Sequence, residues 1–370
     1  MTTYLDLHVL QTVPPSNVNR DDTGSPKTAV FGGVRRARVS SQAWKRAMRL
    51  AFRKTIAAQH LGHRTKRIVE LLATEIAAQA PELSDVAEEL ALAVWKQTKL
   101  EVVVPTAKAG EDPKPPEAQY LVFLSAGQIS GLAELAVTAR RGGEALSGKE
   151  VLRLADTSHS VDIALFGRMV ANAPDWNVDA CAQVAHALSV HAVDNEFDYF
   201  TAVDDKAPED NTGAGMIGTV EFNSSTLYRY ATVNIDALRK ALGDAAVTDE
   251  AVAAFVEAFV TSMPTGKQAT FANRTLPDAV LVQVRHGQPV NLVGAFEEPV
   301  RADEGPRLAA AAQRLAQRSN ELDEAFGNAP AASWTVAVGA AREPLAGTGQ
   351  PTDLAGLLQQ VRTTLTAPAT

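Results

Sequence analysis

Residues 30–49 read VFGGVRRARVSSQAWKRAMR and contain the signals for a turn, a strand and a helix in direct succession. Two glycines favour a tight turn, and VRRARV at 34–39 is typical of a short basic strand. Ser40 or Ser41 then predicts the start of a helix, because serine side chains accept hydrogen bonds from the first backbone N–H groups. This order predicts a mixed α and β fold.

Two stripes of side chains define the helix that follows, which we expect to end near Lys54. Residues spaced by four lie on one face of a helix. The apolar stripe is expected to face the core and consists of Trp44, Met48 and Phe52. The basic stripe beside it consists of Lys45, Arg49 and Arg53.

Positive charge is concentrated around this stretch. The chain has 370 residues and a formal net charge of −8, yet the window from Thr23 to Val69 contains no Asp or Glu and holds twelve of the 35 Lys and Arg. The window therefore carries +12 and the rest of the chain −20. Such segregation suits an anionic ligand. A solvated helix face paired with acidic neighbours is an equally open interpretation of a basic run.

The remaining pattern predicts an α+β fold. Residues 4–13 alternate as a strand with one buried face, and we expect strands from both ends of the chain to share one sheet. A helical block near 60–175 would be inserted as a subdomain. Further helices are expected at 128–140, 161–172 and 178–192. The order of FDYFTAVDD at 197–205, a loop of small and polar residues, MIGTVEF at 216–222 and TLYRYATVN at 226–234 predicts a long hairpin followed by a third strand.

Composition favours a cytoplasmic protein. Cys181 is the only cysteine, so an internal disulfide is excluded and a reducing compartment is expected. The N-terminal residues lack the basic and apolar regions of a secretory signal. No apolar run has the length of a membrane span, so no membrane partner is expected.

The common enzyme motifs are missing. No HExxH, CxxC or Cys/His cluster is present, and neither a metal nor a cofactor is predicted. Lys267 in PTGKQ is followed by Gln268 rather than the Ser or Thr of a phosphate-binding Walker loop. His186 and His191, five apart on a predicted helix, would point to different faces.

Anion-binding features are better represented. The predicted helix offers free N–H groups at its N-terminus, and Ser40, Ser41 and Gln42 add side-chain donors. Lys45, Arg46 and Arg49 follow on the next turns, while Gly32-Gly33 would permit close backbone approach. This combination suits the successive phosphates of a nucleic acid better than one small anion.

The stretch NVNRDDTGSPKTAVFGGVRRARVSSQAWKRAMR at 17–49 closely resembles the N-terminal signature of the CasC family, the backbone subunit of the type I-E CRISPR surveillance complex Cascade. The resemblance continues in four blocks that follow in the family's order: DIALFGRM at 162–169, DYFTAVDD at 198–205, EFNSSTLYRYATVN at 221–234 and PTGKQATFANRTLPDAVLV at 264–282.

The resemblance implies a fold shaped like a right hand. Its palm would be an RNA-recognition-motif-like (ferredoxin-like) sheet formed by residues 1–60 and 176–370. Helical fingers would be inserted at 61–175, and a β-hairpin thumb would lie at about 197–227.

It also implies a function without catalysis. Several copies would stack as a filament along the CRISPR guide RNA, each thumb reaching a neighbouring copy and displacing a guide base at regular intervals. The exposed bases would pair with target DNA. Other Cascade subunits would complete the complex, and a recruited helicase-nuclease would cut the target.

Individual residues carry over from the family. Those expected to hold the guide backbone are Arg20, Lys27, Ser40, Gln42, Lys45, Arg46 and Arg49. Met169 would wedge beside the displaced base, unless it is a core methionine. Phe200 and Thr201 would lie on the thumb near the kink, although Phe200 could equally be a buried strand residue. Lys267 and Gln268 would contact RNA from a palm loop.

Two other functions remain open on the residues alone. Asp21 or Asp22 in the turn, or His8, could do acid–base work in an RNA endonuclease of a related CRISPR effector. Adjacent turn aspartates are, however, mostly solvated or capping residues. A general single-strand-binding protein without a CRISPR role would show the same basic window.

Overall fold

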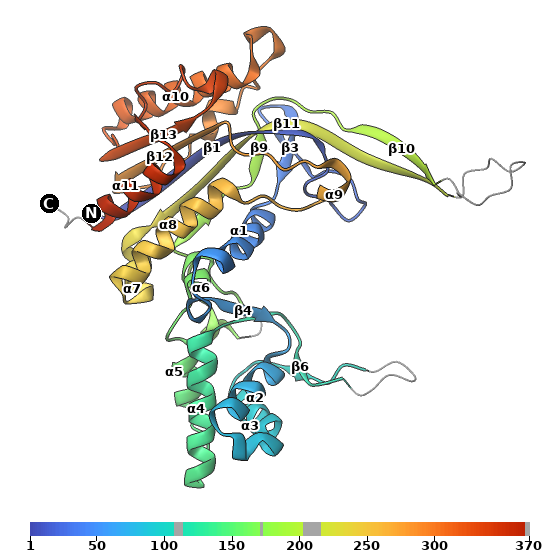
Figure 1. The fold of residues 1–370 in the computed structure, drawn as a ribbon, viewed down its shortest axis with the longest axis vertical. Helices are drawn as coiled ribbons and strands as arrows, with labels where there is room; N and C mark the ends of the chain where they lie inside the picture. Colours follow the sequence, from blue (N-terminus) through green and yellow to red (C-terminus); the bar gives the residue numbers. More distant parts are fainter. Residues whose placement is uncertain (107–113, 171–172, 203–215, 367–370) are drawn as a thin grey trace, which may run out of the picture. The chain divides into compact units, whose positions relative to one another are not determined.

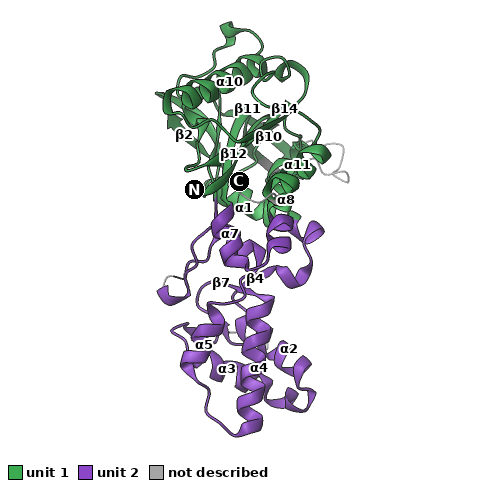
Figure 2. Ribbon diagram, turned by 90° about the vertical axis from the view of Figure 1, so that its left-hand side faces the viewer, with its two compact units in different colours: residues 1–51, 183–234, 252–370 green, residues 52–182, 235–251 purple. Residues whose placement is uncertain are grey.

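The computed structural model describes residues 1–106, 114–170, 173–202 and 216–366. The chain divides into two compact units, coloured separately in Figure 2. The first comprises residues 1–51, 183–234 and 252–370, and the second comprises residues 52–182 and 235–251. The helical insertion expected at 61–175 falls within the second unit.

A ten-stranded sheet forms the centre of the first unit, with the order β14-β13-β12-β1-β11-β9-β3-β2 and with β8 and β10 also paired to β11. Its longer strands are β1 (Thr3–Ser16), β3 (Val34–Val39), β10 (Glu196–Ala202), β11 (Met216–Asn234), β12 (Ala279–His286) and β13 (Ala332–Ala337). The shorter ones are β2 (Thr28–Phe31), β8 (Ala182–Val184), β9 (Ala187–Ser189) and β14 (Gln350–Pro351). Strands from both ends of the chain thus share one sheet, and the α+β prediction is confirmed.

The central strand β1 differs from its prediction because both of its faces are buried. Leu5, Leu7 and Val9 are fully buried, and so are Asp6 and His8 between them. The alternation of apolar and polar residues predicted one solvated face, which is wrong here because helices cover both sides of the sheet.

Helices α1 (Ser41–Thr55) and α8 (Ala245–Thr261) cover one face, and α10 (Arg307–Phe326) covers the other (Figure 1). Arg229 of β11 marks the first face: its guanidinium carbon lies 3.7 Å from the Trp44 ring centroid and 4.6 Å from that of Phe259. On the second face, Tyr228 and Leu281 belong to one apolar core together with residues of α10. Helix α11 (Leu354–Thr366) ends the described chain.

The second unit is mainly helical. Its helices are α2 (Ile68–Gln79), α3 (Ala87–Lys96), α4 (Ala126–Gly142), α5 (Gly148–Ala155), α6 (Val161–Phe166) and α7 (Ile235–Leu242). Two small ribbons accompany them, β4 (Gly62–Thr65) with β7 (Val122–Ser125) and β5 (Val102–Val103) with β6 (Glu117–Ala118). Trp95 and Trp176, with ring centroids 6.1 Å apart, lie in its apolar core.

Two predictions of local structure are wrong. Residues 178–192 contain the short strands β8 and β9 instead of a helix, because both pair with β11. The second strand of the predicted hairpin and the predicted third strand form one continuous strand, β11, because β1 pairs with it from Asn223 to Asn234 while β10 pairs with its first part. The hairpin itself is confirmed, because residues 197–202 belong to β10, which pairs antiparallel with the first part of β11. Of the expected thumb, residues 203–215 lie outside the described residues.

Among the residues that the structure describes, no helix is both long enough and apolar enough to cross a bilayer.

Candidate nucleic-acid interface

The two glycines at 32–33 form the turn of the β2–β3 hairpin. Both have positive φ, +59° at Gly32 and +77° at Gly33, and Phe31 pairs with Val34 across them. Two consecutive residues with positive φ are the pattern of a type I′ turn, which glycine adopts without strain. A Cβ at Gly32 would lie 1.6 Å from the backbone oxygen of Glu297. The close approach predicted at this pair is therefore an approach to the protein's own backbone.

One member of the basic window, Arg36, is fully buried in the sheet. Its guanidinium donates hydrogen bonds to the backbone oxygens of Phe31 (3.1 Å), Ser189 (2.9 Å), Phe296 (2.8 Å) and Glu297 (2.9 Å). All of these acceptors belong to the protein itself. Arg36 therefore holds the β2–β3 hairpin in place and is not available to a ligand.

Helix α1 begins as predicted. The Ser40 hydroxyl accepts a hydrogen bond from Ala43 N at 3.3 Å, and Ser40 itself is buried. Trp44 and Met48 are buried on the core side, as predicted for the apolar stripe. Gln42 and Arg46 are exposed, whereas Lys45 and Arg49 are half-buried. Partial burial lowers the pKa of Lys45 because it disfavours the charged amine.

Asn19 joins the loop after β1 to the start of this helix. Its side-chain oxygen accepts a hydrogen bond from Ser40 N at 2.9 Å, and its backbone oxygen accepts one from Lys27 N at 2.9 Å. The loop between them is closed by a β-bridge that pairs Arg20 with Pro26. Arg20 is exposed and Lys27 half-buried. The backbone of the loop that carries these two cations is thus fixed to the start of α1.

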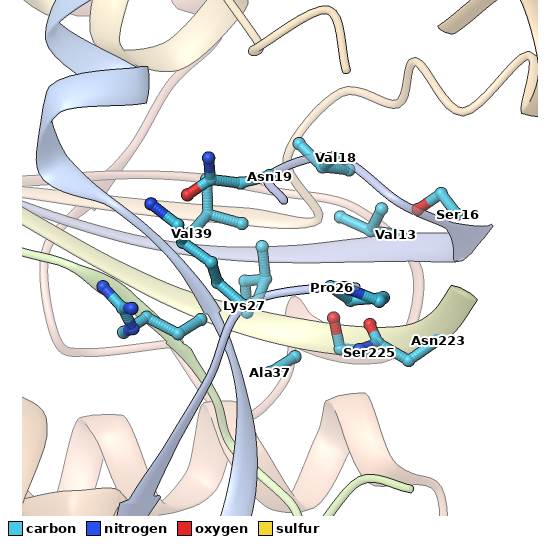
Figure 3. A pocket seen from close by; sticks show the side chains of 12 residues that line it. Val13, Ser16, Val18, Asn19, Pro26, Lys27, Ala37, Val39, Asn223 and Ser225 are labelled. Atoms are coloured by element: carbon cyan, nitrogen blue, oxygen red, sulfur yellow. The ribbon is translucent and has the colours of Figure 1, made fainter. Parts of the chain in front are cut away.

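A small pocket opens next to this junction. Figure 3 shows its lining, in which Asn19 and Lys27 come from the loop, and Asn223 and Ser225 from β11. Arg38 of β3 also lines it. Arg38 donates from Nε to the backbone oxygen of Thr28 at 3.2 Å. The pocket therefore combines apolar side chains with cationic groups at the same place.

A second loop reaches the first from far along the chain. A Cβ at Gly266 would lie 2.0 Å from the backbone oxygen of Val18, so only glycine permits this contact. Lys267 follows with a left-handed backbone, φ +50°, and precedes the short helix α9 (Gln268–Phe271). Lys267 and Gln268 are both half-buried. The PTGKQ motif thus lies against the loop that carries Arg20 and Lys27.

The hairpin of β10 and β11 carries the aromatic candidates, and Figure 1 shows it extending away from the other strands. Phe200 pairs with Gly218 and is 46% exposed, so the interpretation as a buried strand residue is wrong. Thr201 is exposed. Phe197 and Tyr199 are more exposed still, and the sequence analysis did not single them out. Large exposed aromatics on a strand are typical of a surface that binds a partner.

Met169 belongs to the second unit and is 83% exposed, which excludes the alternative that it is a core methionine. Its neighbour Arg168 is buried and explains this placement. The Arg168 guanidinium donates to the backbone oxygens of Trp176 (2.6 Å), Phe123 (3.0 Å) and Ala155 (2.8 Å). Arg168 therefore holds the loop after α6 in place, and Met169 beside it is exposed.

Asp21 is occupied within its own turn. One carboxylate oxygen accepts hydrogen bonds from the Thr23 hydroxyl (2.7 Å), Thr23 N (2.9 Å) and Ser25 N (3.0 Å). These bonds, that of the hydroxyl above all, lower the pKa of the carboxyl. Asp21 thus serves as a turn former, and Asp22 beside it is exposed. Within the described ranges, no three His, Cys, Asp or Glu side chains are grouped as metal ligands.

The histidines have mostly structural positions. His8 is fully buried, its Nδ1 lies 2.9 Å from the Tyr228 hydroxyl, and burial lowers its pKa to about 3. His191 accepts from Thr226 N at 3.1 Å and has a pKa lowered to about 4, chiefly by burial. His186 lies in a loop between β8 and β9, with Nδ1 3.4 Å from Ser41 N. The prediction that His186 and His191 share a helix is wrong.

The first unit therefore carries all the residues predicted to hold the guide backbone, together with the two predicted RNA contacts of the palm loop. The former are Arg20, Lys27, Ser40, Gln42, Lys45, Arg46 and Arg49, and the latter are Lys267 and Gln268. Sequence reasoning missed Asn17, Asn19 and Arg38. Asn17 donates to the backbone oxygens of Gly24 and Glu221, both at 2.9 Å, and so shapes the first loop. Two asparagines spaced by two in a turn-rich segment were the available signal, because asparagine side chains commonly bond to nearby backbone.

Known proteins match this chain over nearly its whole length. The family model of the CT1975-like protein matches residues 5–360. A chain of a solved "CRISPR RNA-guided surveillance complex, pre-nicking" is 34% identical with a TM-score of 0.83, and the match covers 98% of this chain and 100% of that one. A chain of another "CRISPR RNA-guided surveillance complex" is 29% identical with a TM-score of 0.72, over 96% and 99% of the two chains. No curated protein matches. This chain belongs to the CT1975-like protein family.

Proposed function

We propose that this chain is the CasC-type subunit of a type I-E Cascade complex and that it binds the CRISPR guide RNA as a non-catalytic scaffold. The observation that carries the proposal is the junction of three cationic segments, in which Asn19 ties Lys27 to the start of α1 and Gly266 brings Lys267 onto Val18. The similarity to two chains of CRISPR RNA-guided surveillance complexes supports the identity of the RNA.

The first unit corresponds to an RNA-recognition-motif-like palm. The order β12-β1-β11-β9 is all antiparallel, and the chain runs through it as β1, α1, β9, β11, α8, β12. This βαββαβ succession with the fourth strand beside the first supports a ferredoxin-like assignment. Helix α10 covers the face of this sheet opposite α1 and α8. We therefore place the RNA at the start of α1 and at the two loops that carry Arg20, Lys27 and Lys267.

The second unit corresponds to the fingers, with Met169 as the wedge beside a displaced base, and β10–β11 corresponds to the thumb with Phe200 and Thr201. In this proposal further copies of the chain continue along the RNA. Target DNA pairs with the exposed guide bases, other Cascade subunits close the ends, and a helicase-nuclease is recruited. All of this takes place in the cytoplasm. Backbone contacts suit such a role because they are independent of sequence.

The salt dependence of RNA binding tests the proposal. About five phosphate contacts per subunit predict a slope of log K against log salt near ~−3.5 for a single strand. Lys45→Ala and Arg49→Ala should each weaken binding equally for RNAs of unrelated sequence and make the slope shallower by about 0.7.

Lys149→Ala is the matched control, because Lys149 is an exposed lysine on α5 of the second unit. It should leave affinity and slope unchanged. A loss that depends on RNA sequence, or equal losses for Lys45 and Lys149, would contradict the phosphate-contact assignment.

A further inference from the structure

Glu221 is an acidic side chain at the place where the proposed function puts a polyanion. It lies on β11, opposite Phe197 of β10, and is half-buried. Its carboxylate accepts a hydrogen bond from the Ser25 hydroxyl at 2.8 Å and another from Asn195 Nδ2 at 3.2 Å. Its backbone oxygen accepts a third from Asn17 Nδ2 at 2.9 Å. Every one of these contacts links the hairpin to a neighbouring segment or to its own base.

The segment held in this way is the loop that carries Arg20 and Lys27. Asn17 also donates to the backbone oxygen of Gly24 at 2.9 Å, and Asp21 N donates to the backbone oxygen of Ser25 at 3.0 Å. The loop is thus closed on itself, and Ser25 is the point at which its side chains attach to Glu221. Without that attachment the loop would keep its internal turn and the Asn17 bond to the Glu221 backbone oxygen, but it would lose its bond to the Glu221 carboxylate.

The next residue on the strand faces the second cationic loop. The ring centroid of Phe222 lies 5.8 Å from that of Phe271, the last residue of α9. Successive side chains on a strand point to opposite faces. Residues 221 and 222 therefore contact the Arg20–Lys27 loop on one side and the helix after Lys267 on the other.

The negative charge of Glu221 is unfavourable for RNA binding at this position, because a carboxylate repels a phosphate backbone. We propose that Glu221 is a positioning residue for guide RNA, which sets the Arg20–Lys27 loop against the base of the β10–β11 hairpin through the Ser25 hydroxyl. This inference rests on the proposed function. A loop held in its binding position before the ligand arrives loses less conformational freedom on binding. Because of this attachment, RNA binding by the loop also depends on whether the base of the β10–β11 hairpin is ordered.

The pair Glu221→Ala and Glu221→Gln separates positioning from charge. Both changes remove the same negative charge. The glutamine can still accept from Asn195 and donate to the Ser25 oxygen, whereas alanine makes neither bond. We expect Glu221→Gln to bind single-stranded RNA at least as tightly as the unchanged chain. Glu221→Ala should bind about tenfold more weakly than Glu221→Gln, which is the size expected for the loss of a hydrogen bond to a placed group.

Two further readouts exclude a general loss of stability. Arg20 would be held less firmly, whereas Lys27 keeps its backbone bond to Asn19, so the salt slope of Glu221→Ala should be shallower by about 0.7, as for one lost phosphate contact. Ser25→Ala should weaken binding in the same direction, and adding it to Glu221→Ala should cause no further loss, because the two side chains act as one unit. Affinity is measured at a temperature where thermal melting shows every variant to be folded.

The outcomes distinguish the inference from the proposed function. If Glu221→Ala and Glu221→Gln bind RNA equally, the inference is overturned while the losses at Lys45 and Arg49 still stand. If the unchanged chain binds no RNA, both are overturned. Additive losses at Ser25 and Glu221 would also contradict the inference, since they would show two independent effects.

Discussion

Two arginines of the basic window, Arg36 and Arg46, have opposite roles although both lie in the same acid-free stretch. Arg36 is buried and donates to four backbone oxygens, whereas Arg46 is exposed on α1. We expect Arg36→Ala to lower the free energy of unfolding by about 3 kcal/mol, because it leaves buried acceptors without donors. Arg46→Ala should change it by less than about 0.5 kcal/mol. Urea denaturation measures both, and equal effects would contradict the assignment.

His8 predicts how stability depends on pH. Its pKa is lowered to about 3 by burial, against about 6.5 in the unfolded chain. Below pH 6.5 the unfolded state therefore binds a proton that the native state does not, so stability falls as pH falls toward 3. Between pH 7 and pH 5 this residue should cost about 2 kcal/mol. His8→Gln should remove that part of the pH dependence; an unchanged slope between pH 7 and 5 would contradict it.

At the residue scale, types and spacings predicted much of the site. Ser40 as the helix start and Trp44 with Met48 as core residues are confirmed, because each depends on local geometry alone. The burial of Arg36 could not be predicted, since its acceptors at 189, 296 and 297 are brought near only by the fold. Predictions that Ser40, Gln42 and the cations contact RNA stay predictions.

At the scale of elements, the β2–β3 turn offers a matched pair of substitutions. Gly32 and Gly33 have similar positive φ, but only Gly32 lies against the backbone of Glu297. Gly33→Ala should cost about 1 kcal/mol, the strain of a left-handed alanine. Gly32→Ala should cost several times more, because the backbone of Glu297 must also move. Thermal unfolding measures the difference, and equal costs would show that the close approach has no energetic role.

Elements whose pattern reflects local periodicity were predicted well, as for α1 and α4. Some elements that are defined by strand pairing were not predicted. Strands β8 and β9 have short apolar alternations that also fit a helix, and only their pairing with β11 decides between the two. The continuity of β11 could not be predicted for the same reason, since the strand pairs with β10 at one end and with β1 at the other.

At the scale of the whole molecule, the order of elements accounts for the site better than any single motif. Segments at 17–27, 40–49 and 264–271 meet because β1, α1 and α9 belong to the same unit. The competing endonuclease interpretation loses support at the same scale. Asp21 is engaged by its own turn, and His8 is enclosed by the sheet. His8 is therefore withheld from the surface, whereas Asp21 and the exposed Asp22 lie in the same loop as Arg20 and Lys27.

The most direct test is to purify the protein from cells that express a CRISPR array and the other Cascade subunits, and to sequence the RNA that accompanies it. We expect RNA of one defined length with repeat-derived ends. The Lys45→Ala and Arg49→Ala double variant should retain less of it. RNA of mixed length and origin would instead indicate a general single-strand-binding protein, and a folded preparation without RNA would contradict the account.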